Sequence, residues 1–205
     1  MSKTQEQTTE VTILDAAKRV FLRKGYAAAR MQEVADEADI NKAMLHYYFR
    51  SKEKLFNVIL AEAVGRVAPI INRTLTEPGL SVLEKLELIS ERHMQVIFQE
   101  PHLPLFLIHE LSQRRDTIAK EIGEQVDQSA LLAFFQQVTE EGLAGKIKQV
   151  DPVHLILNAI SLTVFPFVIG PIVQAMSGAS PENYEAILKD RKEEVRKALR
   201  AMLQP

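Results

Sequence analysis

Apolar residues recur at intervals of three and four along almost the whole chain, and the few glycines and prolines lie between these runs. Such spacing is typical of helices that bury one face. No segment keeps the alternation of apolar and polar residues that a strand would need. The pattern predicts an all-α fold of about nine helices, with no internal repeat and no low-complexity segment.

Three short helices are predicted in the first fifty residues. The first covers residues 12–24 and ends before Gly25, which is a good C-terminal stop. Residues 31–52 predict two helices around a three-residue turn, because a set of apolar residues is spaced to bury between them: Val34, Ala38, Ile40, Leu45 and Phe49. The small Ala35 permits close approach, and Asn41 can cap the second helix at about residues 42–48.

The remaining helices follow from caps and helix breakers. A fourth begins near Ser51 and runs to Pro69 or just beyond, and a capping box at residues 81–84 starts a fifth that ends near Gln99. A shorter helix ends near residue 112. A stripe with a four-residue spacing then predicts one long helix over about 118–142, and Asp-Pro at 151–152 and Ser-Pro at 180–181 start the last two.

Composition narrows the class of protein. The chain has 205 residues and 46% hydrophobic content, which is enough for a substantial core. It has no cysteine, which excludes disulfides and thiolate zinc sites and agrees with a cytoplasmic location. The first ten residues are too polar for a signal peptide, and residues 1–8 are expected to form a flexible arm.

The uncharged segment from Leu155 to Val173 has the length of a membrane span. Several of its residues suit hydrocarbon poorly, and no cluster of Lys or Arg flanks it: Asn158, Ser161, Thr163, Pro166, Gly170 and Pro171. A helix buried in a subunit interface explains this composition better. We therefore expect no membrane association and a dimer contact here.

The charge is distributed unevenly. The net charge is −2, but residues 1–60 carry 10 Lys/Arg and 8 Asp/Glu, whereas residues 61–205 carry 15 and 19. Four basic residues against Glu53 alone make residues 41–54 strongly positive: Lys42, Arg50, Lys52 and Lys54. A charge run is ordinarily a solvated face, but this one coincides with the helix pair and predicts contact with a nucleic-acid backbone.

The second helix of the pair carries the candidate DNA contacts. Lys42, Ala43 and His46 lie within one turn and can face base edges together: lysine donates to guanine acceptors, and the alanine methyl can touch thymine. The hydroxyls of Tyr47 and Tyr48 can donate to phosphates, although part of Tyr48 is expected to pack inside the helix pair.

The residues from Gly25-Tyr26 through Glu33-Val-Ala35 to Leu45-His-Tyr-Tyr-Phe49 and Ser51-Lys-Glu-Lys-Leu55 resemble the N-terminal domain of tetracycline-repressor-like (TetR) regulators, over roughly residues 9–57. Asp39 stands where that family usually has glycine, which Asp can replace because it enters left-handed conformations readily. His46 replaces the usual tyrosine.

The resemblance also implies functional residues and an organisation. Lys52 matches the family's phosphate-contacting lysine. Ala29 and Arg30 stand where the family more often has a phosphate-contacting Thr or Ser, so Arg30 would have to replace that contact. The implied organisation is a DNA-binding domain over 9–57 and a sensing and dimerisation domain over 58–205, with the last two helices pairing with their copies in a four-helix bundle.

The chemistry of the C-terminal part is less specific. Two histidines and three aromatic residues could line an apolar pocket, and packing in the core explains the same residues: His93, Phe98, Phe106, His109 and Phe134. No metal motif, nucleophile elbow or phosphate loop occurs, so the chain is expected to be neither an enzyme nor a carrier of a cofactor or metal.

The sequence thus predicts a homodimeric cytoplasmic transcription regulator that binds a palindromic operator in double-stranded DNA. The expected mode of regulation is repression. A small apolar or amphipathic effector would change the spacing of the two DNA readers and release the operator. Two alternatives stay open: a DNA-binding protein without sequence preference, and a helical ligand-binding protein that does not regulate transcription.

Overall fold

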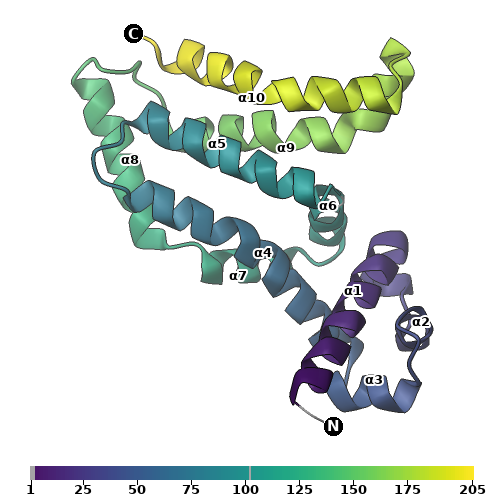
Figure 1. Ribbon diagram of the computed structural model, residues 1–205. Helices are drawn as coiled ribbons and strands as arrows, with labels where there is room; N and C mark the ends of the chain where they lie inside the picture. Colours follow the sequence, from purple (N-terminus) through teal and green to yellow (C-terminus); the bar gives the residue numbers. More distant parts are fainter. Residues whose placement is uncertain (1–2, 102) are drawn as a thin grey trace. The chain divides into compact units, whose positions relative to one another are not determined.

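The computed structural model describes residues 3–101 and 103–205, and the regular elements of these residues are all helices (Figure 1). The first five are α1 (Lys3–Ala28), α2 (Met31–Glu37), α3 (Lys42–Tyr48), α4 (Lys52–Thr76) and α5 (Val82–Gln99). They are followed by α6 (Leu103–Gln113), α7 (Arg115–Gln125), α8 (Gln128–Leu143), α9 (Pro152–Ser177) and α10 (Pro181–Leu203). The predicted all-α class is confirmed.

Two boundaries differ from the prediction. The helix expected over 118–142 is two helices, because Asp127 caps α8: its Oδ1 accepts hydrogen bonds from the backbone N–H groups of Ser129 (2.9 Å) and Ala130 (3.2 Å). Helix α1 begins at Lys3, so the described part of the expected arm is helical; residues 1 and 2 lie outside the described residues. Gly25, with φ of 71°, interrupts α1 where a stop was predicted.

The chain forms two compact units. The first contains the residues up to Gly65 together with Leu105–Ile122, and the second contains Arg66–Pro104 and Gly123–Pro205. Most of α6 and most of α7 thus pack with the N-terminal helices. Whether 9–57 and 58–205 act as separate functional domains stays a prediction.

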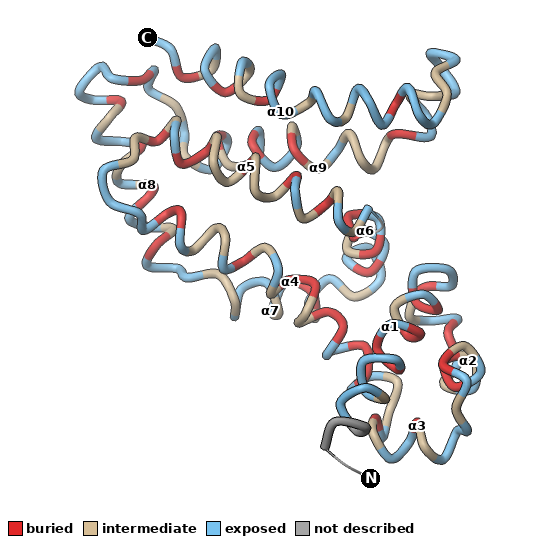
Figure 2. Tube along the Cα trace, in the orientation of Figure 1, coloured by how far each residue is buried: buried red, intermediate tan, exposed pale blue. Residues whose placement is uncertain are grey.

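The first unit is held by an aromatic core. Phe21 and Phe56 are buried and meet edge to face at 5.5 Å between ring centroids. Tyr26 meets the same Phe56 ring at 4.9 Å, and Phe106 of α6 meets it from 5.8 Å. Helix α2 packs on α1 and α3 packs on α2, and Val34 and Leu45 are buried as their spacing predicted. Figure 2 shows buried positions in α1 and α2.

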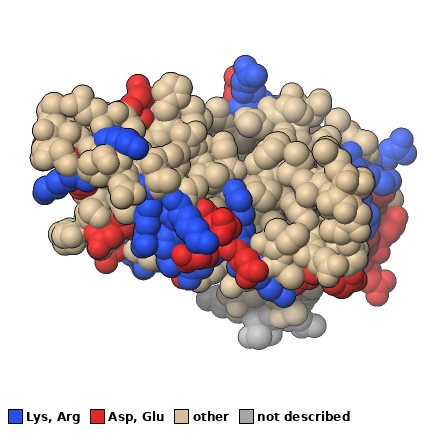
Figure 3. Space-filling model, turned by 90° about the horizontal axis from the view of Figure 1, so that it is seen from above, with Lys and Arg blue, Asp and Glu red and all other residues tan. Residues whose placement is uncertain are grey.

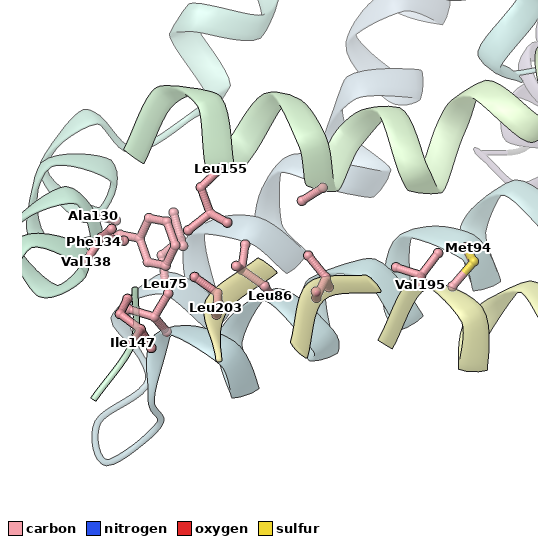
Figure 4. Packing of buried hydrophobic residues seen from close by; sticks show 13 residues of the cluster. Leu75, Leu86, Met94, Ala130, Phe134, Val138, Ile147, Leu155, Val195 and Leu203 are labelled. Atoms are coloured by element: carbon pink, nitrogen blue, oxygen red, sulfur yellow. The ribbon is translucent and has the colours of Figure 1, made fainter. Parts of the chain in front are cut away.

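The second unit has its own aliphatic core, in which α10 packs on α5 and α9, and α8 closes one end. Figure 4 shows the side chains of this core, among them Leu86, Phe134, Leu155, Val195 and Leu203, which are all nearly or fully buried. This burial follows from the three-and-four spacing, which places the apolar residues of each helix on one face.

Pro166 inside α9 is the site of two polar attachments to α10. Pro166 has no N–H, so the Leu162 carbonyl lacks its helical donor and accepts one from Arg191 Nε of α10 at 3.4 Å instead. The Tyr184 hydroxyl donates to the Pro166 carbonyl at 2.7 Å, and its ring lies where a Cβ on Gly170 would come within 2.8 Å. Gly170 therefore permits the close approach of α9 and α10.

Ion pairs join α10 to α5 at the surface. Glu87 accepts hydrogen bonds from Arg200, with the Nε–Oε1 distance at 2.8 Å, and Glu91 pairs with Lys192 and Arg196. Acidic and basic side chains also lie next to one another on the face of the molecule shown in Figure 3. Such exposed pairs contribute little stability individually, but they neutralise one another, so they do not form a surface of one sign.

Candidate DNA-binding site

The start of α3 has the geometry of a capped helix. Asn41 is in an extended conformation (φ −79°, ψ 156°), and its side-chain oxygen accepts the backbone N–H of Met44 at 2.8 Å. The predicted cap is therefore present, and α3 begins at Lys42 as the sequence indicated.

The turn before α3 needs one left-handed residue. Asp39 has φ of 53° and is the one non-glycine residue with positive φ among the described residues. The next residue, Ile40, donates its N–H to the Ala35 carbonyl at 3.0 Å, which closes the turn onto α2. The expectation that Asp39 takes the conformation usually left to glycine is confirmed.

The outer face of α3 presents the predicted contact residues to solvent. Lys42, Ala43 and His46 are exposed, and Tyr47 is 75% exposed, whereas Leu45 is fully buried. Tyr48 is half-buried, and its hydroxyl is buried without a hydrogen-bond partner among the described residues. The side chains that could reach base edges thus lie on one face, and Tyr48 belongs partly to the core, as expected.

Lys52 makes contacts that the sequence did not reveal. Its ammonium group donates to the carbonyls of Tyr26 (2.8 Å), Ala29 (3.0 Å) and Ala27 (3.3 Å), so each of its three N–H groups has an acceptor inside the protein. Lys52 therefore ties the start of α4 to the end of α1. Its predicted contact with a phosphate stays a prediction, and it would require one of these hydrogen bonds to be shared.

Ion pairs fix α2 against α1. Glu37 accepts hydrogen bonds from Arg23 (2.7 Å) and Arg19 (2.8 Å), and these bonds lower its pKa from 4.5 to about 2. The hydrogen bond from Lys24 at 2.7 Å, and a second from the Arg30 N–H at 3.1 Å, lower the pKa of Glu33. The Arg30 side chain is exposed, and its predicted contact with a phosphate stays a prediction.

The five residues expected to line an effector pocket fall in different units. Phe106 and His109 belong to the first, where Phe106 packs on Phe56 and His109 lies against Gly25. His93, Phe98 and Phe134 belong to the second. Neither unit by itself therefore contains the expected cluster.

The three residues in the second unit have different surroundings. Phe134 is fully buried in the aliphatic core, as packing alone would place it. The Phe98 ring meets Phe167 edge to face at 5.2 Å. Burial lowers the pKa of His93, which favours its neutral form.

A hollow of about 490 Å³ lies elsewhere in the second unit, between the α4–α5 turn and the end of α8. Ser81, Glu84, Gln137 and Glu141 are among its lining residues, and none of the five predicted pocket residues is. The carboxylates of Glu84 and Glu141 accept backbone N–H groups at the start of α5. The hollow is thus bordered by groups that already cap a helix.

The exposed face of α3, its cap and the turn onto α2 define the class of this protein: a helix-turn-helix DNA-binding protein. Comparison with known proteins specifies the class further. Residues 13–59 match the family model described as bacterial regulatory proteins of the tetR family. The match covers α2, α3 and parts of α1 and α4.

Relatives and solved structures extend the similarity to the rest of the chain. The fatty acid metabolism regulator protein of Bacillus subtilis is 24% identical over 161 residues, which are 78% of this chain and 81% of that one. The transcriptional regulator RutR of Escherichia coli K12 is 28% identical over 175 residues, covering 82% and 78%.

Two solved structures share the fold. HlyIIR, a hemolysin II transcriptional regulator, superposes with a TM-score of 0.65 at 22% identity over 94% of this chain and 97% of that one. The fatty acid degradation regulator FadR of Bacillus halodurans does so with a TM-score of 0.60 at 21% identity, over 94% and 96%. The chain is a TetR-like transcriptional regulator, and its relatives are regulators rather than enzymes.

Proposed function

We propose that this regulator is a homodimeric repressor that binds a palindromic operator through α3 and releases it when a small apolar or amphipathic molecule binds. The observation that carries the proposal is the outer face of α3, where Lys42, Ala43 and His46 are exposed on a helix whose opposite side is anchored by the buried Leu45. A rigid helix with donor groups and a methyl group on its free face suits the major groove.

The dimer is supported by an unpaired apolar stripe on α9. Six large apolar residues of this helix are about half or more exposed, up to 83% for the last of them: Val153, Leu157, Ile160, Phe165, Ile172 and Met176. Successive members are three, four, five or seven residues apart, which places them on one side of the helix. Exposed apolar residues along one side of a helix indicate a covered interface, and we assign it to a second copy of this chain.

A bilayer is the competing partner for this stripe, because α4 and α9 are both long and apolar enough to cross a membrane. Two features favour the second copy. The relatives of the chain are transcriptional regulators, and two prolines and the exposed Ser161 and Asn158 interrupt the apolar surface. Vesicle flotation of the full chain would detect membrane binding directly.

The choice of an apolar or amphipathic effector has two supports. The core of the second unit consists of aliphatic and aromatic side chains, so a cavity that opened within it would favour ligands of the same kind. Two of the similar proteins carry names that refer to fatty acid metabolism or degradation. We therefore infer an effector with a long apolar part. The chemistry of its polar headgroup is not specified, because other similar regulators have names that do not refer to fatty acids.

Selection of binding sites from a random-sequence duplex pool tests the proposal. The wild-type protein is expected to enrich one palindrome whose half-site centres lie about 34–36 Å apart or a multiple of that distance. With that duplex, Lys42→Ala and His46→Ala should each weaken binding by about 1–3 kcal/mol, whereas Lys146→Ala, at an exposed position of the second unit, should not. Recovery of unrelated sequences would instead support a DNA-binding protein without sequence preference.

A further inference from the structure

Two charged residues, Glu110 in α6 and Arg114 just after that helix, each have a buried polar atom without a hydrogen-bond partner among the described residues. Glu110 is fully buried, and its Oε2 has no hydrogen-bond partner among the described residues. Arg114, one helical turn later, has a side chain that is 17% exposed and a buried Nη1 that also lacks one. Unpaired buried polar atoms cost free energy, so stability alone does not account for these two residues.

Both residues contact the end of α1. Glu110 Oε1 accepts the backbone N–H of Tyr26 at 2.9 Å. The guanidinium carbon of Arg114 lies 4.1 Å from the centroid of the Tyr26 ring and 4.7 Å from that of Phe56, both within the range of a cation–π contact. Tyr26 is therefore held at its backbone by one residue and at its ring by the other.

The backbone next to Tyr26 is also closely packed against α6. The His109 ring covers Gly25, where a Cβ would come within 2.4 Å of His109 Nε2. Gly25 has φ of 71°, so the chain changes direction immediately before Tyr26. His109, Glu110 and Arg114 therefore contact α1 at the point where the α1 backbone departs from helical geometry.

The same backbone is fastened from the opposite end of the helix-turn-helix. Lys52, the first residue of α4, donates to the carbonyls of Tyr26 and Ala29. Residues 30–51, which contain α2 and α3, thus leave from Ala29 and return at Lys52, whose ammonium group joins this end to both Ala29 and Tyr26. Any change in the position of Tyr26 therefore changes the position of α3.

We infer that Glu110 and Arg114 are positioning residues for DNA recognition: they hold Tyr26 so that α3 is presented in one orientation. The inference rests on the proposed function, because it concerns how the same reading helix is placed. It also assigns a role in DNA binding to a segment that lies more than fifty residues after the family match ends.

Four variants of the full chain test this inference on the duplex selected by the wild type and on a random duplex. Glu110→Ala and Arg114→Ala should each weaken binding of the selected duplex about tenfold or more, because they leave a buried donor unpaired or remove a cation from two rings. Binding of the random duplex, which depends on phosphate charge, should stay within about twofold. Glu110→Gln keeps an acceptor oxygen and should restore most of the preference, and Arg115→Ala, exposed and next to Arg114, is the matched control.

Hydrogen exchange at the Tyr26 amide provides a readout that does not involve DNA. Exchange should accelerate in Glu110→Ala and stay near the wild-type rate in Glu110→Gln, because only the alanine variant removes the acceptor.

Three results distinguish the possible failures. If the alanine variants melt at lower temperature but bind the selected duplex like the wild type when folded, the two residues are only structural and the inference is overturned. Unchanged exchange at Tyr26 in Glu110→Ala overturns it as well. A wild-type protein that prefers no sequence would instead overturn the proposed function.

Discussion

At the scale of single residues, carboxylates do most to set the geometry of the DNA reader. Glu33 and Glu37 hold α2 against α1 through three basic side chains, and Glu110 holds the last turn of α1. The basic residues in these contacts form ion pairs within the protein, so their charge is already neutralised. On the outer face of α3, Lys42 and His46 are exposed, as is Arg50 just beyond the helix.

The pairing of Glu37 makes a prediction about pH. Its pKa falls from 4.5 to about 2 in the folded protein, so the ion pair stabilises the fold fully above about pH 4.5, and this contribution is lost as the pH falls toward 2. We expect Glu37→Gln to lower the urea midpoint at pH 6 and to have progressively less effect below pH 4.5.

Urea titrations of both proteins between pH 6 and pH 2.5 measure this difference. Asp116→Asn, at an exposed position of α7, is the control for loss of a carboxylate. A difference between wild type and Glu37→Gln that stays constant across this range would contradict the assignment to ion pairing.

At the scale of helices, α9 and α10 combine two kinds of surface. Their inner faces form the core of the second unit, where Val195 and Leu199 are buried. The outer face of α9 carries the exposed apolar stripe. The distinction matters for experiments on the dimer, because Leu199→Glu would place a charge in the core and unfold the unit rather than separate two copies.

Leu157→Glu is the sharper variant, because Leu157 is 53% exposed on the outer face of α9. It should leave the monomer folded and shift the molecular mass in solution from about twice 23.1 kDa toward the single chain. Multi-angle light scattering at micromolar concentration measures this change.

Leu132→Glu, on α8 and 63% exposed, controls for adding a charge at another exposed leucine. It should leave the dimer intact. A Leu157→Glu protein that stays dimeric would place the interface elsewhere, and a wild-type monomer would remove the dimer from the proposed function.

At the scale of the whole molecule, α4 carries the chain from the first unit to the second at Gly65 and Arg66. Pro69 lies within this helix and cannot donate to the carbonyl four residues earlier, which is that of Gly65. The helix is therefore weakened at the point where the two units join. Two further connections of the chain between the units fall within α6, at Pro104–Leu105, and within α7, at Ile122–Gly123. These three connections are the covalent routes by which effector binding in the second unit would affect α3.

An effector must bind one state of the protein more tightly than the other to release DNA. A C12–C18 fatty acid at one hundred times its dissociation constant should stabilise the native state by about 2.7 kcal/mol if it binds no unfolded chain. It should also weaken binding of the selected duplex. Thermal shift and DNA-release assays with acids of different chain length measure both effects.

The outcomes of this experiment separate the site from its consequence. A fatty acid that raises the melting temperature without releasing DNA would support a binding site and contradict the regulatory coupling. If neither quantity changes across the series, the effector belongs to another chemical class. Hexadecane sulfonate, which keeps the apolar tail and replaces the carboxylate, is the matched control for the headgroup.

Local patterns in the sequence predicted most of the helices and the exposed face of α3. The Asn41 cap, the left-handed Asp39 and the exposure of Lys42 and His46 each depend on residues within one or two turns, so spacing and side-chain chemistry predicted them. The break between α7 and α8 also has a local cause, which is the capping Asp127. The prediction missed it because the apolar spacing of a single helix continues across this position.

Contacts between distant segments could be learned only from the tertiary structure. Nothing near Glu110 indicates that it accepts the N–H of Tyr26, 84 residues earlier, and nothing near Lys52 indicates that its ammonium is used by the end of α1. The apolar residues Phe106 and Phe134 have similar local patterns, yet they pack in different units. Helical periodicity specifies which face of a helix is buried, whereas the partner of that face depends on how the whole chain packs.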